Sequence, residues 1–109
     1  MPNQQARLDR VFRALGDPTR RAVLARLALG AAPVGELARP FAMALPSFVQ
    51  HLGVLEDCGL VTSTKMGRVR TYRLAPQPLK AAERWMTEQR QTWEKRLDQL
   101  DAYLKIMKE

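Results

Sequence analysis

The stretch that decides the fold is residues 33–74, which read PVGELARPFAMALPSFVQHLGVLEDCGLVTSTKMGRVRTYRL. Residues 34–39 allow about one and a half helical turns, because Pro40 cannot continue a helix. A second helix begins at Pro46, whose fixed backbone angle suits a first helical position. Its inner face consists of Phe48, Leu52 and Leu55. Two helices joined by a tight turn predict a helix-turn-helix over about residues 34–58.

The rest of this stretch predicts a basic β-hairpin over about residues 60–75. Residues 60–65 and 69–74 are rich in Val, Thr and Tyr, and the segment Met66-Gly67-Arg68 between them supplies a turn. The positive side chains of the hairpin are Lys65, Arg68, Arg70 and Arg73. A basic hairpin that directly follows a helix-turn-helix is expected to be a wing.

Two more helices are predicted upstream. The first ends at Gly16, and its apolar residues fall on one face: Leu8, Val11, Phe12 and Leu15. Asp17 and Pro18 start the second, because the carboxylate can cap free backbone N–H groups and proline suits the first turn. The buried stripe of the second helix is Val23, Leu24 and Leu27.

Downstream, residues 78–107 predict one long amphipathic helix without Gly or Pro after Pro78. Its apolar seam repeats every seven residues at Leu79, Met86, Trp93, Leu100 and Met107, with Leu97 and Leu104 between. About 30 residues make a rod of about 45 Å, which a small body cannot cover. We therefore expect a second chain to bury the seam.

In chain order, the predicted elements are four helices, a β-hairpin and a long helix. The predicted fold class is mainly α with a small β-hairpin: a winged helix-turn-helix with a long C-terminal dimerisation helix. A chain of 109 residues has room for one modest core, so we expect a single domain over residues 1–109.

The charge balance favours a polyanionic partner. The chain has 18 Lys and Arg against 11 Asp and Glu, a net charge of +7. Residues 1–77 have 11 basic and 5 acidic side chains (11 − 5 = +6), whereas residues 78–109 have 7 and 6 (7 − 6 = +1). Nucleic acid is the first candidate. Membrane association is not expected, because the last helix is nearly neutral and no apolar run could span a bilayer.

The second helix of a helix-turn-helix enters the major groove, so double-stranded DNA is the expected partner. Its polar candidates for base contact are Ser47, Gln50 and His51, although His51 is equally compatible with a packing or capping role. The amide of Gln50 can both donate and accept, which suits adenine. The expected phosphate or minor-groove contacts on the wing are Lys65, Arg68 and Arg70.

Five motifs stand in order across residues 8–74: Leu15-Gly16-Asp17-Pro18-Thr19-Arg20-Arg21, His51-Leu52 with Leu55-Glu56, Gly59-Leu60-Val61, Gly67-Arg68 and Tyr72-Arg73-Leu74. Together they resemble the ArsR (arsenic-repressor) family of bacterial transcriptional regulators. The resemblance implies a homodimer on a partly palindromic operator, with the first and last helices pairing across a two-fold axis. The expected interface is Leu8, Val11, Phe12, Met86, Trp93, Leu97, Leu100 and Leu104.

This chain departs from many members of that family, which have serines where it has Ala44 and Val49. It also lacks the family's metal-ligand motifs, since one cysteine, Cys58, and one histidine cannot supply a tetrahedral site. No nucleophile with a base and no glycine-rich phosphate loop is recognisable. We therefore expect no metal, no cofactor and no enzymatic activity, and a small-molecule effector stays open. Cys58 more often packs under a helix end than serves as a redox switch.

The sequence thus predicts a sequence-specific, DNA-binding transcriptional regulator, acting as a repressor and homodimer. The absence of a recognisable export signal and the single cysteine favour the cytoplasm. The alternative is a protein-interaction or RNA-binding winged-helix module, whose C-terminal helix pairs with another protein.

Overall fold

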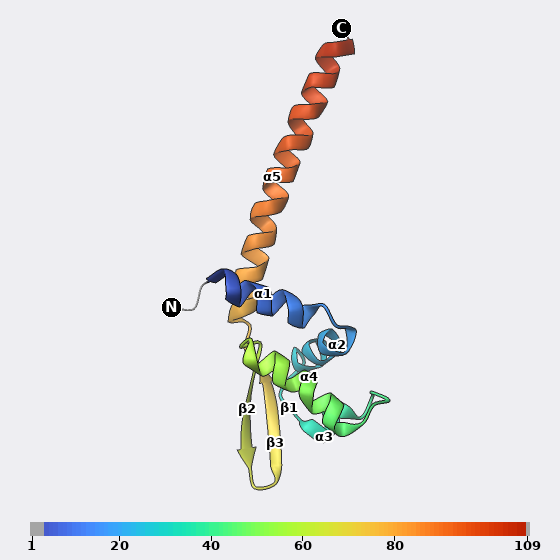
Figure 1. The fold of residues 1–109 in the computed structure, drawn as a ribbon, viewed down its shortest axis with the longest axis vertical. Coiled ribbons are helices and arrows are strands. Elements are labelled where there is room, and N and C mark those ends of the chain that lie inside the picture. The colour runs from blue at the N-terminus through green and yellow to red at the C-terminus, as the bar shows by residue number, and fades with distance from the viewer. Residues whose placement is uncertain (1–3, 109) are drawn as a thin grey trace.

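The computed structural model describes residues 4–108, which form a small body and a projecting helix (Figure 1). The helices of the body are α1 (Gln4–Leu15), α2 (Pro18–Leu27), α3 (Val34–Ala38) and α4 (Leu45–Asp57). Its strands are β1 (Ala32–Pro33), β2 (Val61–Met66) and β3 (Val69–Leu74), and the projecting helix is α5 (Gln77–Lys108). The overall extents are 73 × 36 × 22 Å because α5 extends far beyond the body. This order confirms the predicted winged helix-turn-helix with a long C-terminal helix.

The core forms around the inner face of α4. Phe48, Leu52 and Leu55 are all fully buried, which confirms the helical spacing predicted for this face. They belong to one cluster with buried residues of α1, α2 and α3, the first residues of the hairpin, and Ala82 of α5. Because α4 packs against α1, α2, α3 and β2, its outward face is held in a fixed orientation.

The sheet has three strands, in the order β1-β3-β2, where the sequence predicted only a hairpin. The additional strand β1 pairs antiparallel with β3, with Ala32 opposite Tyr72 and Pro33 opposite Thr71. A two-residue strand that contains proline has no alternating pattern, so periodicity could not indicate it. Through this pairing, β1 connects the base of the wing to the start of α3.

The hairpin closes one residue more tightly than predicted. Met66 pairs with Val69, so only Gly67 and Arg68 form the turn, and Gly67 has a positive φ of 64°. At the other end of the wing, Gly59 follows α4 with a φ of 81°, and the Leu60 amide donates to the Leu55 carbonyl at 3.0 Å. Glycine at these two places lets the chain reverse direction between α4, β2 and β3.

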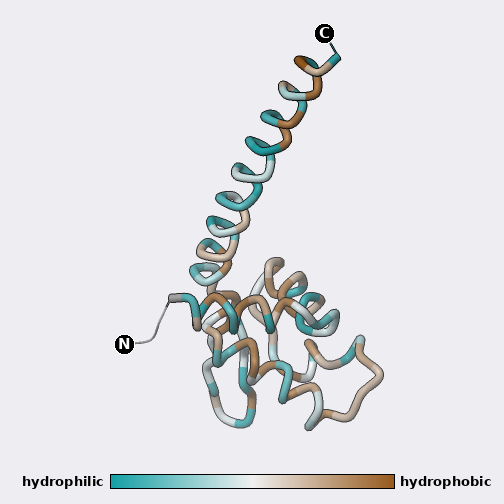
Figure 2. The backbone as a smooth tube through the Cα atoms, turned by 45° about the horizontal axis from the view of Figure 1, so that its top comes forward, coloured by the Kyte–Doolittle hydropathy of each residue, from teal (hydrophilic) through white to brown (hydrophobic). Residues whose placement is uncertain are grey.

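The projecting helix α5 touches the body only through its first turns. Ala82 is its one buried residue among those described, and it packs in the core cluster. Beyond it, hydrophobic residues recur turn after turn along the distal half of α5 (Figure 2). Large side chains that remain exposed there are Trp93, Leu97, Leu100, Tyr103, Leu104, Ile106 and Met107.

Candidate nucleic-acid interface

The outward face of α4 is the first part of the candidate interface. Ser47 and Gln50 are exposed on it, as the burial of Phe48 and Leu52 on the opposite face requires. No side chain caps α4 at Ala44, among the residues described, and Pro46 has no N–H to satisfy. The remaining free amides and the positive end of the helix dipole give this end of α4 an affinity for anions such as phosphate.

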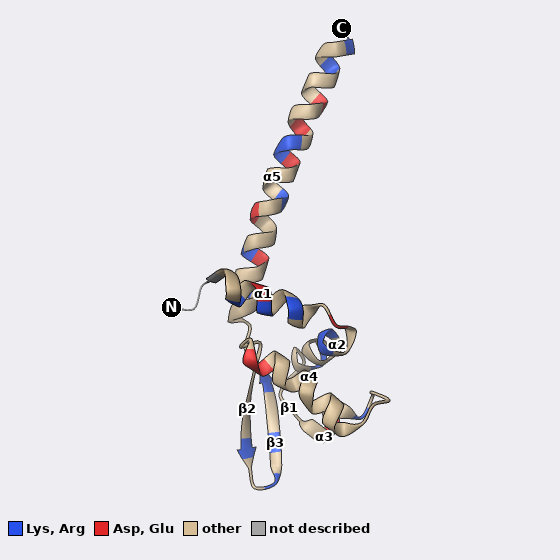
Figure 3. Ribbon diagram, viewed as in Figure 1, with Lys and Arg blue, Asp and Glu red and all other residues tan. Residues whose placement is uncertain are grey.

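The wing is the second part. Lys65, Arg68 and Arg70 are exposed, and Figure 3 shows basic residues along the hairpin. The strand register places Lys65 directly opposite Arg70. Two like charges in that position destabilise a hairpin in free protein, and a bound polyanion would relieve the repulsion.

A chain of polar contacts links the wing to α4. The Arg70 Nη1 donates to Ser63 Oγ at 2.8 Å, and Ser63 Oγ donates to Glu56 Oε2 at 2.9 Å. Glu56 lies at the C-terminal end of α4, so this chain fixes the wing relative to that helix. Arg70 is therefore partly engaged inside the protein, whereas Lys65 and Arg68 have no such partner among the contacts that the structure describes.

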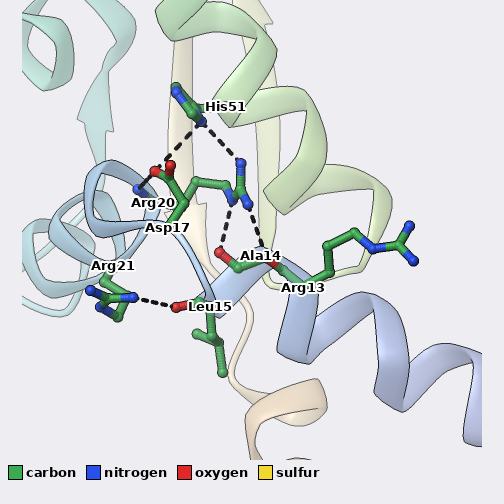
Figure 4. A network of polar contacts seen from close by, with 7 residues as sticks. All are labelled: Arg13, Ala14, Leu15, Asp17, Arg20, Arg21 and His51. Atoms are coloured by element: carbon green, nitrogen blue, oxygen red, sulfur yellow. Dashed lines mark hydrogen bonds and ion pairs between the residues drawn. The ribbon is translucent and has the colours of Figure 1, made fainter.

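His51 lies at the edge of the outward face and takes part in a network with α1 and α2 (Figure 4). Its Nδ1 is 3.1 Å from Arg20 Nη1 and 3.7 Å from Asp17 Oδ2, and its side chain is 23% exposed. A guanidinium can only donate, so Nδ1 accepts and the ring proton is on Nε2. The ring thus keeps one donor, Nε2–H, for a contact outside the network.

Arg20 also satisfies the C-terminal end of α1. Its Nε donates to the Ala14 carbonyl at 2.8 Å, and its Nη2 donates to the Arg13 carbonyl at 2.9 Å. Arg21 Nη1 donates to the Leu15 carbonyl at 2.7 Å. The last carbonyls of a helix have no partner within the helix, so these two arginines cap α1 from α2.

The sequence did not predict this role, since Arg20 and Arg21 stood out there only as part of a family motif. The available signal was a pair of arginines one helical turn after a glycine that ends a helix.

Asp17 and Cys58 are among the groups whose pKa values are clearly shifted, each for a local reason. The Asp17 carboxylate accepts a hydrogen bond from the Arg20 backbone amide at 3.0 Å, and chiefly for that reason its pKa is lower than usual. Burial raises the pKa of the Cys58 thiol, whose Sγ donates to the Leu55 carbonyl at 3.4 Å. Cys58 therefore stays protonated at neutral pH and is a weak nucleophile.

The predicted dimer interface separates into three groups. Met86, Trp93, Leu97, Leu100 and Leu104 are between 47% and 64% exposed on α5. Leu8 and Phe12 of α1 are partly buried, and the Phe12 ring packs edge-on against Trp85 at 5.6 Å. Val11 is only 3% exposed and belongs to the core, because α1 turns it toward the body. It supports α1 from within the chain and has no surface to offer a partner.

Residues 4–108 contain neither a cluster of metal ligands nor a helix suited to span a membrane. Nowhere in this range do three or more His, Cys, Asp or Glu side chains converge in a way that could hold a metal ion. None of the described helices combines the length and apolar character needed to cross a membrane.

Known proteins of similar sequence are regulators of transcription. A family model described as a helix-turn-helix domain matches residues 15–64. The HTH-type transcriptional regulator Rv2034 of Mycobacterium tuberculosis is 47% identical over 73 residues, which are 67% of this chain and 68% of the relative. The transcriptional repressor SdpR of Bacillus subtilis is 32% identical over 79 residues, 72% of this chain and 88% of SdpR.

Solved structures give the same result. The crystal structure of an ArsR family transcriptional regulator, RHA00566, has a TM-score of 0.81 and 51% identity, covering 86% of this chain and 97% of that one. The homodimeric winged helix-turn-helix DNA-binding domain of Mb0332 from Mycobacterium bovis has a TM-score of 0.60 and 26% identity, with 84% and 82% covered.

Fold, surface and relatives together define a winged helix-turn-helix, DNA-binding regulator of transcription and not an enzyme. The chain belongs to the ArsR family of transcriptional regulators. Its last helix has no histidine or cysteine with which to bind a metal.

Proposed function

We propose that this regulator is a repressor that binds a partly palindromic DNA operator as a homodimer. The observation that carries the proposal is the like-charge pair of the wing, Lys65 opposite Arg70, on the same body as an uncapped and polar helix α4. Both features cost free energy in the free protein, and both are relieved by phosphate. With Arg68 at the hairpin turn, they form a surface that fits the DNA backbone.

Sequence-specific contacts are assigned to the outward face of α4. Gln50 can make a bidentate contact with adenine, a pairing that discriminates between bases by about 1 to 3 kcal/mol. Ser47 lies one turn earlier on the same face. His51 contributes its remaining Nε2–H donor to a base edge or a phosphate.

The homodimer is proposed because the exposed apolar seam of α5 needs a cover. The seam consists of Met86, Trp93, Leu97, Leu100 and Leu104. The partly buried Leu8 and Phe12 of α1 belong to the same proposed interface. A second copy of the same chain offers a matching surface, and the homodimeric Mb0332 domain supports this assembly. Two-fold symmetry in the protein leads to two-fold symmetry in the operator.

Repression follows from occupancy, since a dimer on its operator blocks access to the promoter. The similarity to SdpR, which is named a transcriptional repressor, supports this direction of control. We place the protein in the cytoplasm, where its operator would lie.

The test is selection of bound duplexes from a randomised pool, at low and at near-physiological salt. We expect a half-site repeated with two-fold symmetry and a spacing of about 34 Å, one duplex turn. Affinity should fall by about 10³ to 10⁵ between 50 and 200 mM salt if 6 to 10 phosphates are contacted. The double variant Gln50→Ala with Arg68→Ala should lose this binding, whereas Lys105→Ala, at the far end of α5, should keep it. Salt-sensitive binding without any preferred sequence would contradict the proposal.

The exposed seam is also compatible with a second function, that of a protein-interaction or RNA-binding module. Mass measurement separates the two. A particle of twice 12.4 kDa supports the homodimer, whereas a 12.4 kDa monomer means that a different protein covers α5.

A further inference from the structure

One edge of α4 exposes apolar side chains that the core does not use. Leu45 is 54% exposed and Val49 is 44% exposed, and neither belongs to the core cluster. They are four residues apart, so they lie on the same side of the helix. Exposed apolar residues at this place are not needed for folding, because the inner face of α4 is complete without them.

This apolar edge borders the polar positions. Successive residues of a helix are rotated by about 100°, so Ser47 and Val49 lie on either side of Gln50. Gly53, one turn after Val49, has nothing within 4 Å of the place where a Cβ would be. No side chain protrudes from this edge at position 53, so another surface can approach the backbone of α4 closely there.

We propose that Val49 and Leu45 read thymine in the operator through its 5-methyl group. The inference rests on the proposed DNA binding and adds to it a class of base contact. Thymine is the only base that presents an apolar group in the major groove. A valine or leucine can pack on that methyl group, whereas it leaves the amino group of cytosine or adenine without a hydrogen-bond partner. The half-site should then contain thymine beside the adenine that Gln50 reads.

Uracil supplies the probe, because it differs from thymine only by the absence of that methyl group. Each thymine of the selected operator is replaced in turn by uracil, and duplex affinity is measured for wild type, Val49→Ala and Leu45→Ala. Burial of one methyl group corresponds to about a fourfold change in affinity. We expect wild type to bind the uracil duplex about fourfold more weakly at one or two positions, and the matching alanine variant to bind both duplexes equally.

The control variant is Leu29→Ala, which removes an 85% exposed apolar side chain in the loop between α2 and β1 and should keep the full uracil penalty. Thermal unfolding checks that each variant is folded, and Val49→Thr gives a second variant of nearly the same volume. If wild type binds its operator specifically but is indifferent to uracil at every position, the inference fails and the proposed function stands. If no duplex is bound specifically, both fail.

Discussion

Removal of the Arg20 side chain should destabilise the protein far more than removal of its neighbour Arg21. Arg20 is partly buried and its guanidinium makes three contacts, to the Ala14 and Arg13 carbonyls and to His51. Arg21 is exposed and makes one contact of this kind among the described residues, to the Leu15 carbonyl. The two residues are adjacent and of the same type, so each is the control for the other.

The magnitude follows from the number of hydrogen bonds. At about 1 kcal/mol for each partly exposed hydrogen bond, Arg20→Ala should lower the free energy of unfolding by about 2 to 3 kcal/mol, and Arg21→Ala by less than about 1 kcal/mol. Arg20→Lys should recover little, because one ammonium cannot reach three acceptors in a fork. All variants need the same protein concentration, because assembly adds to apparent stability.

The assay is urea unfolding followed by far-ultraviolet circular dichroism, with the slope m checked for constancy. A difference below about 0.5 kcal/mol between the two alanine variants would refute the capping role of Arg20. Because Arg20 joins α1 to α4 through His51, the same variant should also bind its operator less specifically. Among the described contacts Arg21 makes no hydrogen bond or ion pair to α4, so Arg21→Ala should not have this effect.

Three further predictions concern acid stability, the surface of α4 and assembly. Asp17→Ser keeps an N-cap acceptor but removes the charge. Because the pKa of Asp17 in the folded protein is lowered from 3.8, the charged carboxylate stabilises wild type above pH 3.8. This stabilisation is lost as the pH falls through the folded pKa. Free energies of unfolding between about pH 6 and pH 3 should therefore fall more steeply for wild type than for the variant, and equal slopes would contradict the cause assigned to the shift. The methyl group added by Gly53→Ala meets no neighbour, so this variant should raise the free energy of unfolding by about 1 kcal/mol. The same variant should weaken operator binding. Unchanged affinity would mean that DNA does not approach position 53. Leu97→Glu should convert the proposed homodimer to a 12.4 kDa monomer in light scattering, whereas Lys95→Glu on the same helix should not. A dimeric Leu97→Glu protein would exclude this seam as the interface.

Local periodicity predicted the elements of the fold, because each helix has an apolar stripe that is visible within its own segment. The buried face of α4 at Phe48, Leu52 and Leu55 is an example. Strand β1 was not predictable in this way, since Ala32 is held by Tyr72, 40 positions later in the chain (72 − 32 = 40). Two residues contain too little pattern to indicate a strand.

The sequence predicted which residues of the candidate site lie on the surface, but not the contacts that its residues make inside the protein. Hydrophobic spacing alone implies that Ser47 and Gln50 face outward. The inward contact of His51 depends on Arg20, 31 residues earlier, and the packing of α1 decides that Val11 is buried while Phe12 meets Trp85. Such choices depend on how helices cross, which sequence spacing does not determine.

The projecting helix α5 has a consequence for gene dosage. In the proposed homodimer, neither chain has a complete apolar seam until it meets the other. At low expression the amount of assembled regulator then rises with the square of the chain concentration, by mass action. A cell that doubles its supply of this chain would gain about four times as much operator-competent protein in that range. Control by synthesis and degradation would accordingly be steeper than for a regulator that acts as a monomer.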